Sequence, residues 1–214
     1  MAPKRKLDDC PISSKTESFW SKKKHLKELS NFYVSKVDLG NGRIYTSGEA
    51  AFHGAKFRIA AISQTPGSAR RAELMAYGRK FEDECDFEGL TPAQMKSKGG
   101  KSKKNGLELD EKELAIWSAN CIEVQRQICQ YKFDNDEAVR SSLISSGQKI
   151  LVHLANRTPL AKVPSCFWEG KAVLKVDGIT VEVLGGNVLG KIWMEIRRNA
   201  LEEDFFEKEG VVVG

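Results

Sequence analysis

The sequence predicts a mainly helical protein: a compact, multihelical single domain with one or two small β-hairpins. Three observations lead to this prediction. Apolar residues recur at intervals of three and four over most of the chain. Only two pairs of short β-prone segments flank an Asn-Gly or Asp-Gly turn. Hydrophobic residues make up 41% of the 214 residues and charged residues 29%, so the chain is long and apolar enough to bury a core.

The first half of the chain contains one predicted hairpin and three predicted helices. The hairpin pairs residues 32–37 with 43–45 across Asn41-Gly42, and two helices follow over 49–61 and 67–80. A long helix begins after Asp110, a suitable N-cap, and continues to Phe133. Its apolar face consists of Leu114, Trp117, Cys121, Val124 and Ile128.

The second half predicts two more helices and a second hairpin. A helix begins at residues 134–135 and closes at Gly147. The hairpin pairs 171–176 with 180–184 across Asp177-Gly178, and the last helix covers 187–204.

Two stretches do not fit this pattern. Residues 1–16 are polar and predict a disordered arm, whose Lys4-Arg5-Lys6 cluster fits a nuclear address, a phosphate contact or a solubilising terminus. Residues 87–109 hold many Lys, Gly and Ser residues and predict a mobile surface insertion. We therefore expect one domain over 17–209, followed by a short tail over 210–214.

Composition narrows the class of protein. No apolar run approaches the roughly 18 residues of a membrane-spanning helix, and the N-terminus lacks the apolar stretch of a secretory signal. Five widely spaced cysteines without a Cys-x-x-Cys pair fit a reducing compartment. Three scattered histidines offer no metal-ligand spacing. We expect an intracellular protein, cytoplasmic or nuclear, that binds no metal.

A glycine-rich segment precedes the last predicted helix. Gly185 to Lys191 matches Gly-x-x-x-x-Gly-Lys, but Ile192 stands where a P-loop requires Ser or Thr, and too few residues follow for further parallel strands. Two readings remain open for this turn: an anion site formed by free N–H groups at a helix N-terminus, or a plain tight turn.

The helix over 49–61 carries a candidate reactive pair. Residues seven apart return to nearly the same helix face, so Glu49 and Lys56 flank Phe52 on one side, and His53 is predicted to point elsewhere. An ordinary amphipathic helix would show the same spacing. Among the tryptophans, Trp117 and Trp193 are predicted core residues, whereas Trp168 lies in a loop and is the better candidate for a site.

Several segments, in this order, resemble the NADAR family, also called the YbiA-like family. They are Leu29-Ser30-Asn31-Phe32-Tyr33, Tyr45-Thr46-Ser47-Gly48-Glu49 through Lys56-Phe57, Tyr77-Gly78-Arg79, Trp117, Lys132-Phe133, Ile150-Leu151-Val152, Gly186-Asn187-Val188-Leu189-Gly190 and Met194-Glu195-Ile196-Arg197. The late loop departs from the family pattern, because Ser165 replaces an aspartate and Glu169 follows Trp168.

The resemblance implies a multihelical fold and an N-glycosidase that needs no cofactor. It implies two substrate classes: ADP-ribose attached to guanine in nucleic acid, and phosphorylated intermediates of riboflavin synthesis. By similarity Glu49 and Lys56 are the catalytic residues. The ligand-binding positions are Ser30, Asn31, Phe32, Phe52, Arg79, Trp117, Trp168, Gly186, Asn187 and Gly190.

We expect a monomeric hydrolase that removes ADP-ribose from guanine bases. The lysine clusters at 4–6, 22–24 and 96–104 suit a polyanionic partner. Glu49 would stabilise positive charge at C1 or activate water. Lys56 would act as a cation or acid, or as a neutral amine that forms a Schiff base. A riboflavin-intermediate glycosidase and a non-catalytic ADP-ribose-binding module are the alternatives.

Overall fold

The structure is a computed structural model that describes residues 14–40, 42–100, 106–178 and 180–208. Most of the predicted N-terminal arm, the 210–214 tail and residues 101–105 of the predicted insertion lie outside the described residues. Contacts divide the chain into two compact units. The central unit is Ser30–Glu137, and the discontinuous unit joins Met1–Leu29 to Ala138–Gly214. The single domain over 17–209 stays a prediction.

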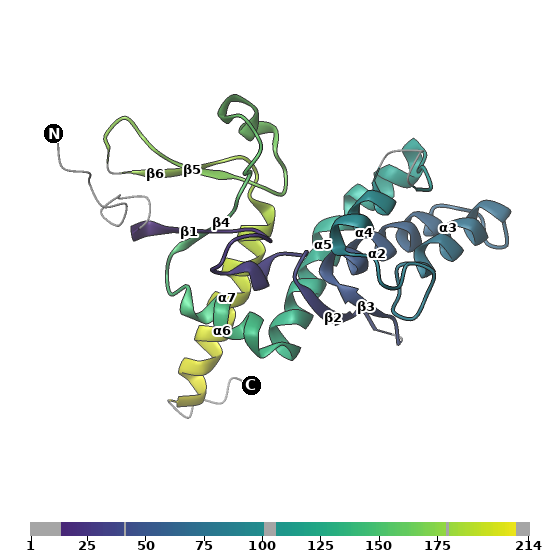
Figure 1. The fold of residues 1–214 in the computed structure, drawn as a ribbon, viewed down its shortest axis with the longest axis horizontal. Coiled ribbons are helices and arrows are strands. Elements are labelled where there is room, and N and C mark those ends of the chain that lie inside the picture. The colour runs from purple at the N-terminus through teal and green to yellow at the C-terminus, as the bar shows by residue number, and fades with distance from the viewer. Residues whose placement is uncertain (1–13, 41, 101–105, 179, 209–214) are drawn as a thin grey trace. The chain divides into compact units, whose positions relative to one another are not determined.

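The central unit is a helical cluster with one hairpin. Its elements are β2 (Val34–Asp38), β3 (Ile44–Ser47), α2 (Gly48–Ile62), α3 (Ala69–Arg79), α4 (Pro92–Gly99) and α5 (Glu111–Asn135). Strands β2 and β3 pair antiparallel, with a register shift between Val34 and Val37. Helix α2 packs against α3, α4 and α5 (Figure 1). A single helix is thereby enclosed by three others.

Capping residues mark the start of α2, α4 and α5 in the central unit. The Ser47 hydroxyl accepts a hydrogen bond from the Ala50 N–H and caps α2. Capping boxes start both α4, with Thr91, and α5, with Asp110. Alanines on α2 allow its neighbours to approach closely, and α5 buries the apolar face that the sequence predicts. The helix that carries the candidate pair is therefore anchored on several sides.

The discontinuous unit combines a small parallel sheet, a hairpin and the C-terminal helix. Its elements are β1 (Thr16–Phe19), η2 (Lys27–Leu29), α6 (Glu137–Ser145), β4 (Ile150–His153), η3 (Leu160–Ser165), β5 (Lys171–Leu174), β6 (Val181–Leu184) and α7 (Val188–Lys208). Strand β1 pairs with β4 in parallel, and β5 pairs with β6 antiparallel. Helix α7, yellow in Figure 1, lies beside β4.

The core of the discontinuous unit forms around Trp193 of α7, which is fully buried as predicted. Its indole Nε1 donates to the Leu29 carbonyl at 2.8 Å, so the polar atom of the ring is satisfied. Phe19 of β1 and Leu151 of β4 are also fully buried. The two chain segments of this unit therefore share one core.

The structure confirms the mainly helical fold, both hairpins and the five predicted helices within a few residues of their bounds. Two elements differ from the prediction. The parallel β1–β4 pair was not predicted, because its strands are far apart in the sequence. The stretch 87–109 was predicted to be irregular, but it contains α4, which is stabilised by its capping box and by the buried Met95 and Gly99.

Within the described part of the chain, no helix is long and apolar enough to cross a membrane.

Candidate active site on helix α2

Three titratable side chains lie buried on one face of α2. Glu49, His53 and Lys56 are 7%, 8% and 7% exposed. They are spaced four and three residues apart, so they occupy adjacent positions along the helix. Burial of an acid, an imidazole and an amine is costly unless partners compensate for it, and such groupings are typical of functional sites. The ordinary amphipathic helix does not describe this face.

Glu49 and His53 form a direct contact. The His53 Nε2 lies 3.2 Å from the Glu49 Oε1. The other ring nitrogen, Nδ1, is buried and has no hydrogen-bond partner in the described structure. The prediction that His53 points away from this face is wrong. The i, i+4 spacing from Glu49 could have identified the contact, because such positions are neighbours on a helix.

The end of α4 closes over the same face. The Lys56 Nζ donates to the Gly99 carbonyl at 2.7 Å. A carbonyl at the C-terminal end of a helix is a favourable acceptor for an ammonium group. A Cβ added to Gly99 would overlap the His53 ring, so only glycine permits this approach. Gly99 therefore contacts two of the three reactive side chains, and the sequence analysis did not identify it.

Aromatic rings line one edge of the cluster. Phe52 of α2 meets Trp117 of α5 edge to face, with ring centroids 4.8 Å apart. The centroids of the Phe52 and His53 rings are 5.7 Å apart. The Lys56 Nζ lies 5.2 Å from the centroid of the Phe57 ring. Two predicted ligand positions, Phe52 and Trp117, are thus brought together beside the predicted catalytic pair.

The segment before the first hairpin is tied to the start of α2. The Glu49 N–H donates to the Asn31 carbonyl at 3.0 Å. The Asn31 side-chain amide exchanges two hydrogen bonds, of 2.7 and 2.9 Å, with the Gln125 amide of α5. Gln125 is almost fully buried, which explains why a polar residue interrupts the apolar face of α5. That interruption was the sequence signal for this residue.

The remaining two positions of this segment also have partners. The Ser30 carbonyl accepts from the buried Lys132 Nζ at 3.0 Å, and the Phe32 ring lies 5.5 Å from the Lys96 Nζ of α4. The structure therefore brings Ser30, Asn31 and Phe32 into the network that holds α2, α4 and α5 around Glu49.

Arg79 is placed elsewhere in the central unit. It is exposed at the end of α3 and lines an open pocket of about 900 Å³ with Arg43 and Arg58. Neither Glu49 nor Lys56 lines that pocket. Arg58 also pairs with Glu82 there.

The other four predicted positions belong to the discontinuous unit. The Asn187 amide is buried and bonds twice to the β4 backbone, accepting from the His153 N–H and donating to the Leu151 carbonyl, both at 2.9 Å. A Cβ on Gly190 would overlap the Leu151 carbonyl, so this glycine allows α7 to approach β4. These contacts assign both residues to packing of the last helix.

Three consecutive N–H groups of the glycine-rich turn are used within the protein. The backbone N–H groups of Gly186, Asn187 and Val188 donate to the carbonyls of Cys166, Glu169 and Phe167. Of the two readings of this segment, the contacts favour the tight turn over the anion site. Trp168 lies in the same loop, half-buried, with its ring against Phe167.

Metal binding and thiol chemistry each require particular side chains in particular surroundings. Within the described residues, no three His, Cys, Asp or Glu side chains gather as a metal site would require. The cysteines the structure describes, Cys85, Cys121, Cys129 and Cys166, are free thiols. Burial raises the pKa of Cys129 to about 12, so this thiol is not reactive.

The sequence matches no protein-family model and none of the curated proteins with which it was compared. The fold is similar to the NMR structure of the E. coli protein YbiA, with a TM-score of 0.53 and 17% sequence identity. The alignment covers 89% of this chain and 88% of the other. The chain thus has a mainly helical, YbiA-like fold, and at this identity the likeness shows the fold alone.

Proposed function

We propose that the chain is an N-glycosidase that hydrolyses the bond between C1 of ADP-ribose and the amino group of guanine in nucleic acid. The buried Glu49, His53 and Lys56 on one face of α2 carry this proposal. Two further observations support it. The sequence resembles the NADAR family in several ordered segments, and the fold is similar to that of YbiA.

The buried groups suit cleavage of a C–N glycosidic bond. Positive charge develops at C1 and negative charge on the leaving nitrogen, so the reaction needs an anion near the sugar and a proton for the base. Glu49 supplies the anion, and its contact with the His53 Nε2 at 3.2 Å positions the carboxylate. Low exposure excludes water and strengthens each of these interactions.

Lys56 acts in this proposal as the nucleophile. Its neutral amine attacks C1 while the bond from C1 to the guanine nitrogen breaks and that nitrogen takes up a proton. The sugar ring opens to a Schiff base on Lys56, and water then hydrolyses this adduct to ADP-ribose and the free amine. Because Nζ donates to the Gly99 carbonyl at 2.7 Å, the amine must leave that partner before it attacks.

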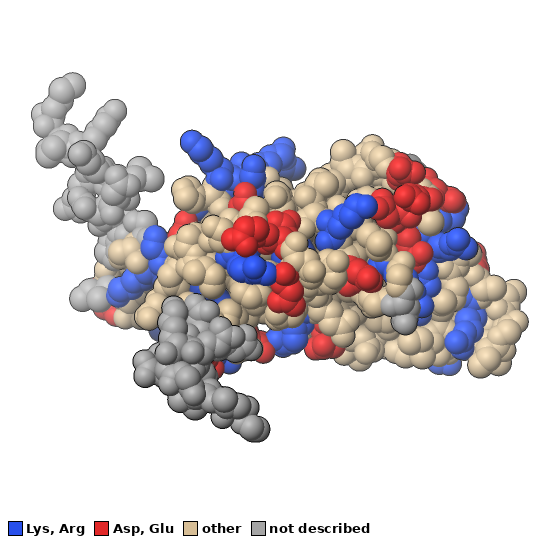
Figure 2. Space-filling view, turned by 90° about the horizontal axis from the view of Figure 1, so that it is seen from below, with Lys and Arg blue, Asp and Glu red and all other residues tan. Residues whose placement is uncertain are grey.

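The aromatic edge and the lysines support a nucleotide substrate. Phe52 and Trp117 place two aromatic rings next to the reactive groups, and proteins commonly bind a base by stacking it on such rings. Lys96 and Lys98 lie on α4, which covers the cluster. On the face shown in Figure 2, basic side chains lie among acidic ones. Lysine side chains of such local clusters would contact phosphates.

The test is turnover of an ADP-ribosylated guanine oligonucleotide, followed by mass spectrometry. We expect release of ADP-ribose and recovery of unmodified guanine. Borohydride added during turnover should trap a sugar adduct on the protein. Lys56→Ala should abolish both turnover and trapping, and Glu49→Gln should lower kcat by at least about a hundredfold.

Lys112→Ala is the matched control, because Lys112 is an exposed lysine on α5 away from the cluster. It should leave turnover and trapping unchanged. Turnover that survives Lys56→Ala would contradict the covalent route. Turnover of a phosphorylated riboflavin intermediate in place of the oligonucleotide would contradict the substrate class, and ADP-ribose binding without any turnover would contradict the enzyme.

A further inference from the structure

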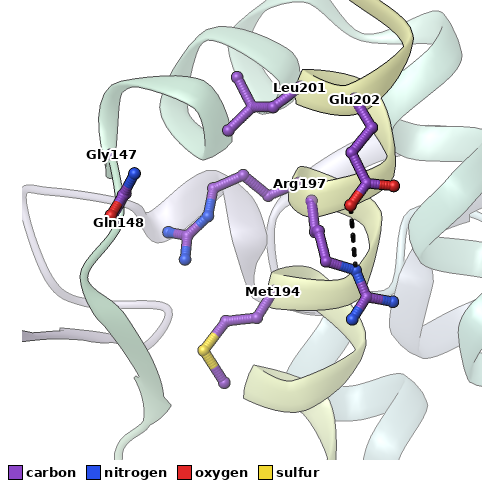
Figure 3. A pocket seen from close by; sticks show the side chains of 7 residues that line it. Gly147, Gln148, Met194, Arg197, Leu201 and Glu202 are labelled. Atoms are coloured by element: carbon purple, nitrogen blue, oxygen red, sulfur yellow. Dashed lines mark ion pairs between the residues drawn. The ribbon is translucent and has the colours of Figure 1, made fainter.

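A second pocket lies in the discontinuous unit, between α7 and the turn that follows α6. It has a volume of about 390 Å³, within the size range of small-molecule sites. Met194 and Leu201 of α7 give it apolar walls, and Gly147 and Gln148 of the turn close the opposite side (Figure 3). None of its lining residues belongs to α2 or to the cluster around Lys56.

The unusual group in this pocket is Arg197. It is only 7% exposed, and its guanidinium donates to the Ser146 hydroxyl at 2.5 Å and to the Lys149 carbonyl at 2.9 Å. Both acceptors are neutral. Arg197 forms no ion pair with any described carboxylate, and burial lowers the pKa of its guanidinium below the ordinary value. A buried cation without a counter-ion is costly, and a bound anion would remove the cost.

The rest of the lining shows what kind of anion fits. Arg198 adds a second cation to the lining, and Glu202, which also lines the pocket, pairs with it at 3.9 Å between Nε and Oε1, the ion pair dashed in Figure 3. Gln148 is exposed, and its side-chain amide makes no hydrogen bond within the described structure, so its N–H groups are available. The N–H groups of guanidinium and amide side chains can donate to the oxygens of a planar carboxylate or of a tetrahedral phosphate. The apolar side chains of Met194 and Leu201 suit an apolar group attached to that anion.

We propose that this pocket is a binding site for a small organic oxyanion, whose charged group meets Arg197 and whose apolar part lies on Met194 and Leu201. The site is separate from the α2 cluster and does not depend on the proposed function. Ligand binding at this site would couple α7 to the turn before β4, because both elements supply donors.

Isothermal titration of the full chain with three matched probes tests the proposal. The probes are phenyl phosphate, benzoate and the neutral benzamide. We expect at least one of the two anions to bind at least about tenfold more tightly than benzamide, and the tighter anion identifies the oxyanion class. Failure of both anions to bind, or equal binding of benzamide, would overturn the proposal.

Two substitutions test whether the anion binds in this pocket. Arg197→Gln should weaken binding of the anion at least about tenfold. The same substitution loses two hydrogen bonds, which could also impair folding. Gln148→Glu avoids this difficulty, because Gln148 is exposed and the new carboxylate would pair with Arg197 in place of the ligand. Gln148→Glu should weaken binding of the anion by a similar factor and leave the melting temperature unchanged.

Asn156→Asp is the charge-matched control, at an exposed loop position outside the pocket. It should leave the affinity unchanged. Anion affinity that is equal in wild type and Gln148→Glu would place the binding elsewhere and overturn the proposal.

Discussion

His53 is the residue that changes the interpretation of α2. Its Nε2 contact converts a lone carboxylate into a Glu–His pair, and its ring lies against Phe52 and Gly99. We expect His53→Leu to lower kcat for the proposed substrate at least about tenfold, because one hydrogen bond that orients the Glu49 carboxylate is lost. KM should change less than kcat.

The conservative variant distinguishes positioning from packing. His53→Gln keeps an N–H donor for Glu49 and should recover most of kcat, whereas a purely structural role would be served equally by leucine. Steady-state kinetics of the three proteins decides this, and equal kcat in His53→Leu and wild type would remove His53 from the site.

Glu113 shows how a single buried carboxylate supports stability. It is fully buried and accepts from Arg70 Nε at 2.8 Å, from Arg70 Nη2 at 2.7 Å and from Gln64 Nε2 at 2.9 Å. Hydrogen bonding to Arg70 holds the pKa of Glu113 below its ordinary value. We expect Glu113→Gln to lower the free energy of unfolding by about 2 kcal/mol at neutral pH.

This loss should depend on pH in a defined direction. A carboxylate whose pKa is depressed in the folded protein stabilises it above its unfolded-state pKa, and the contribution disappears as the pH falls through the folded-state pKa. The difference between Glu113→Gln and wild type in urea unfolding should therefore shrink toward acid pH. Glu111→Gln, exposed in the same first turn of α5, is the control and should change stability little.

At the scale of elements, α4 depends on one glycine. Gly99 lies against the His53 ring and accepts the Lys56 hydrogen bond, so a side chain there would force the end of α4 away from α2. We expect Gly99→Ala to raise the rate of trypsin cleavage after Lys96 and Lys98 at least about tenfold. The neighbouring Gly100→Ala has only ordinary contacts, the nearest at 3.4 Å, and is the control. Equal cleavage of both variants would show that α4 is not held by this contact.

The elements also show what one sequence could predict. Helix α5 was predictable because Trp117, Cys121, Val124 and Ile128 repeat along one face and Asp110 caps it. Helix α4 was not, because its eight residues include lysines, serine and glycine, and tertiary contacts at Met95 and Gly99 override that composition. The β1–β4 pair joins residues 16–19 to 150–153, and local patterns carry no signal for such a pairing.

For the whole molecule, the candidate site was predictable where it lies on one helix. The seven-residue spacing of Glu49 and Lys56 placed both on a face that proved to be buried. Gly99 was not predictable, because it meets Lys56 of α2 only through packing of α4. Gln125 could be noticed as a polar residue on the apolar face of α5, but its partner Asn31 could not, because it lies 94 residues away in the sequence. For the glycine-rich turn the sequence left two readings open, and the structure favours the tight turn because the N–H groups of Gly186, Asn187 and Val188 donate to carbonyls within 166–169.

A nucleic-acid substrate should give the whole protein a characteristic dependence on salt. Lysine side chains that contact phosphates release counter-ions, so kcat/KM for an ADP-ribosylated guanine oligonucleotide should fall steeply as salt rises. For ADP-ribosylated guanosine, which lacks the flanking phosphates, the fall should be much smaller. Parallel salt titrations with the two substrates test this, and identical slopes would exclude a contribution from the nucleic-acid backbone.

The pairing of β1 with β4 has a consequence for synthesis of the chain. The Ser30–Glu137 unit is complete once residue 137 has left the ribosome, whereas Thr16–Phe19 must wait for Ile150–His153 before it has a partner strand. The nascent protein therefore carries an unpaired strand edge while more than half of its length is translated. Sequences near the start are exposed to chaperones and to intermolecular pairing for that period.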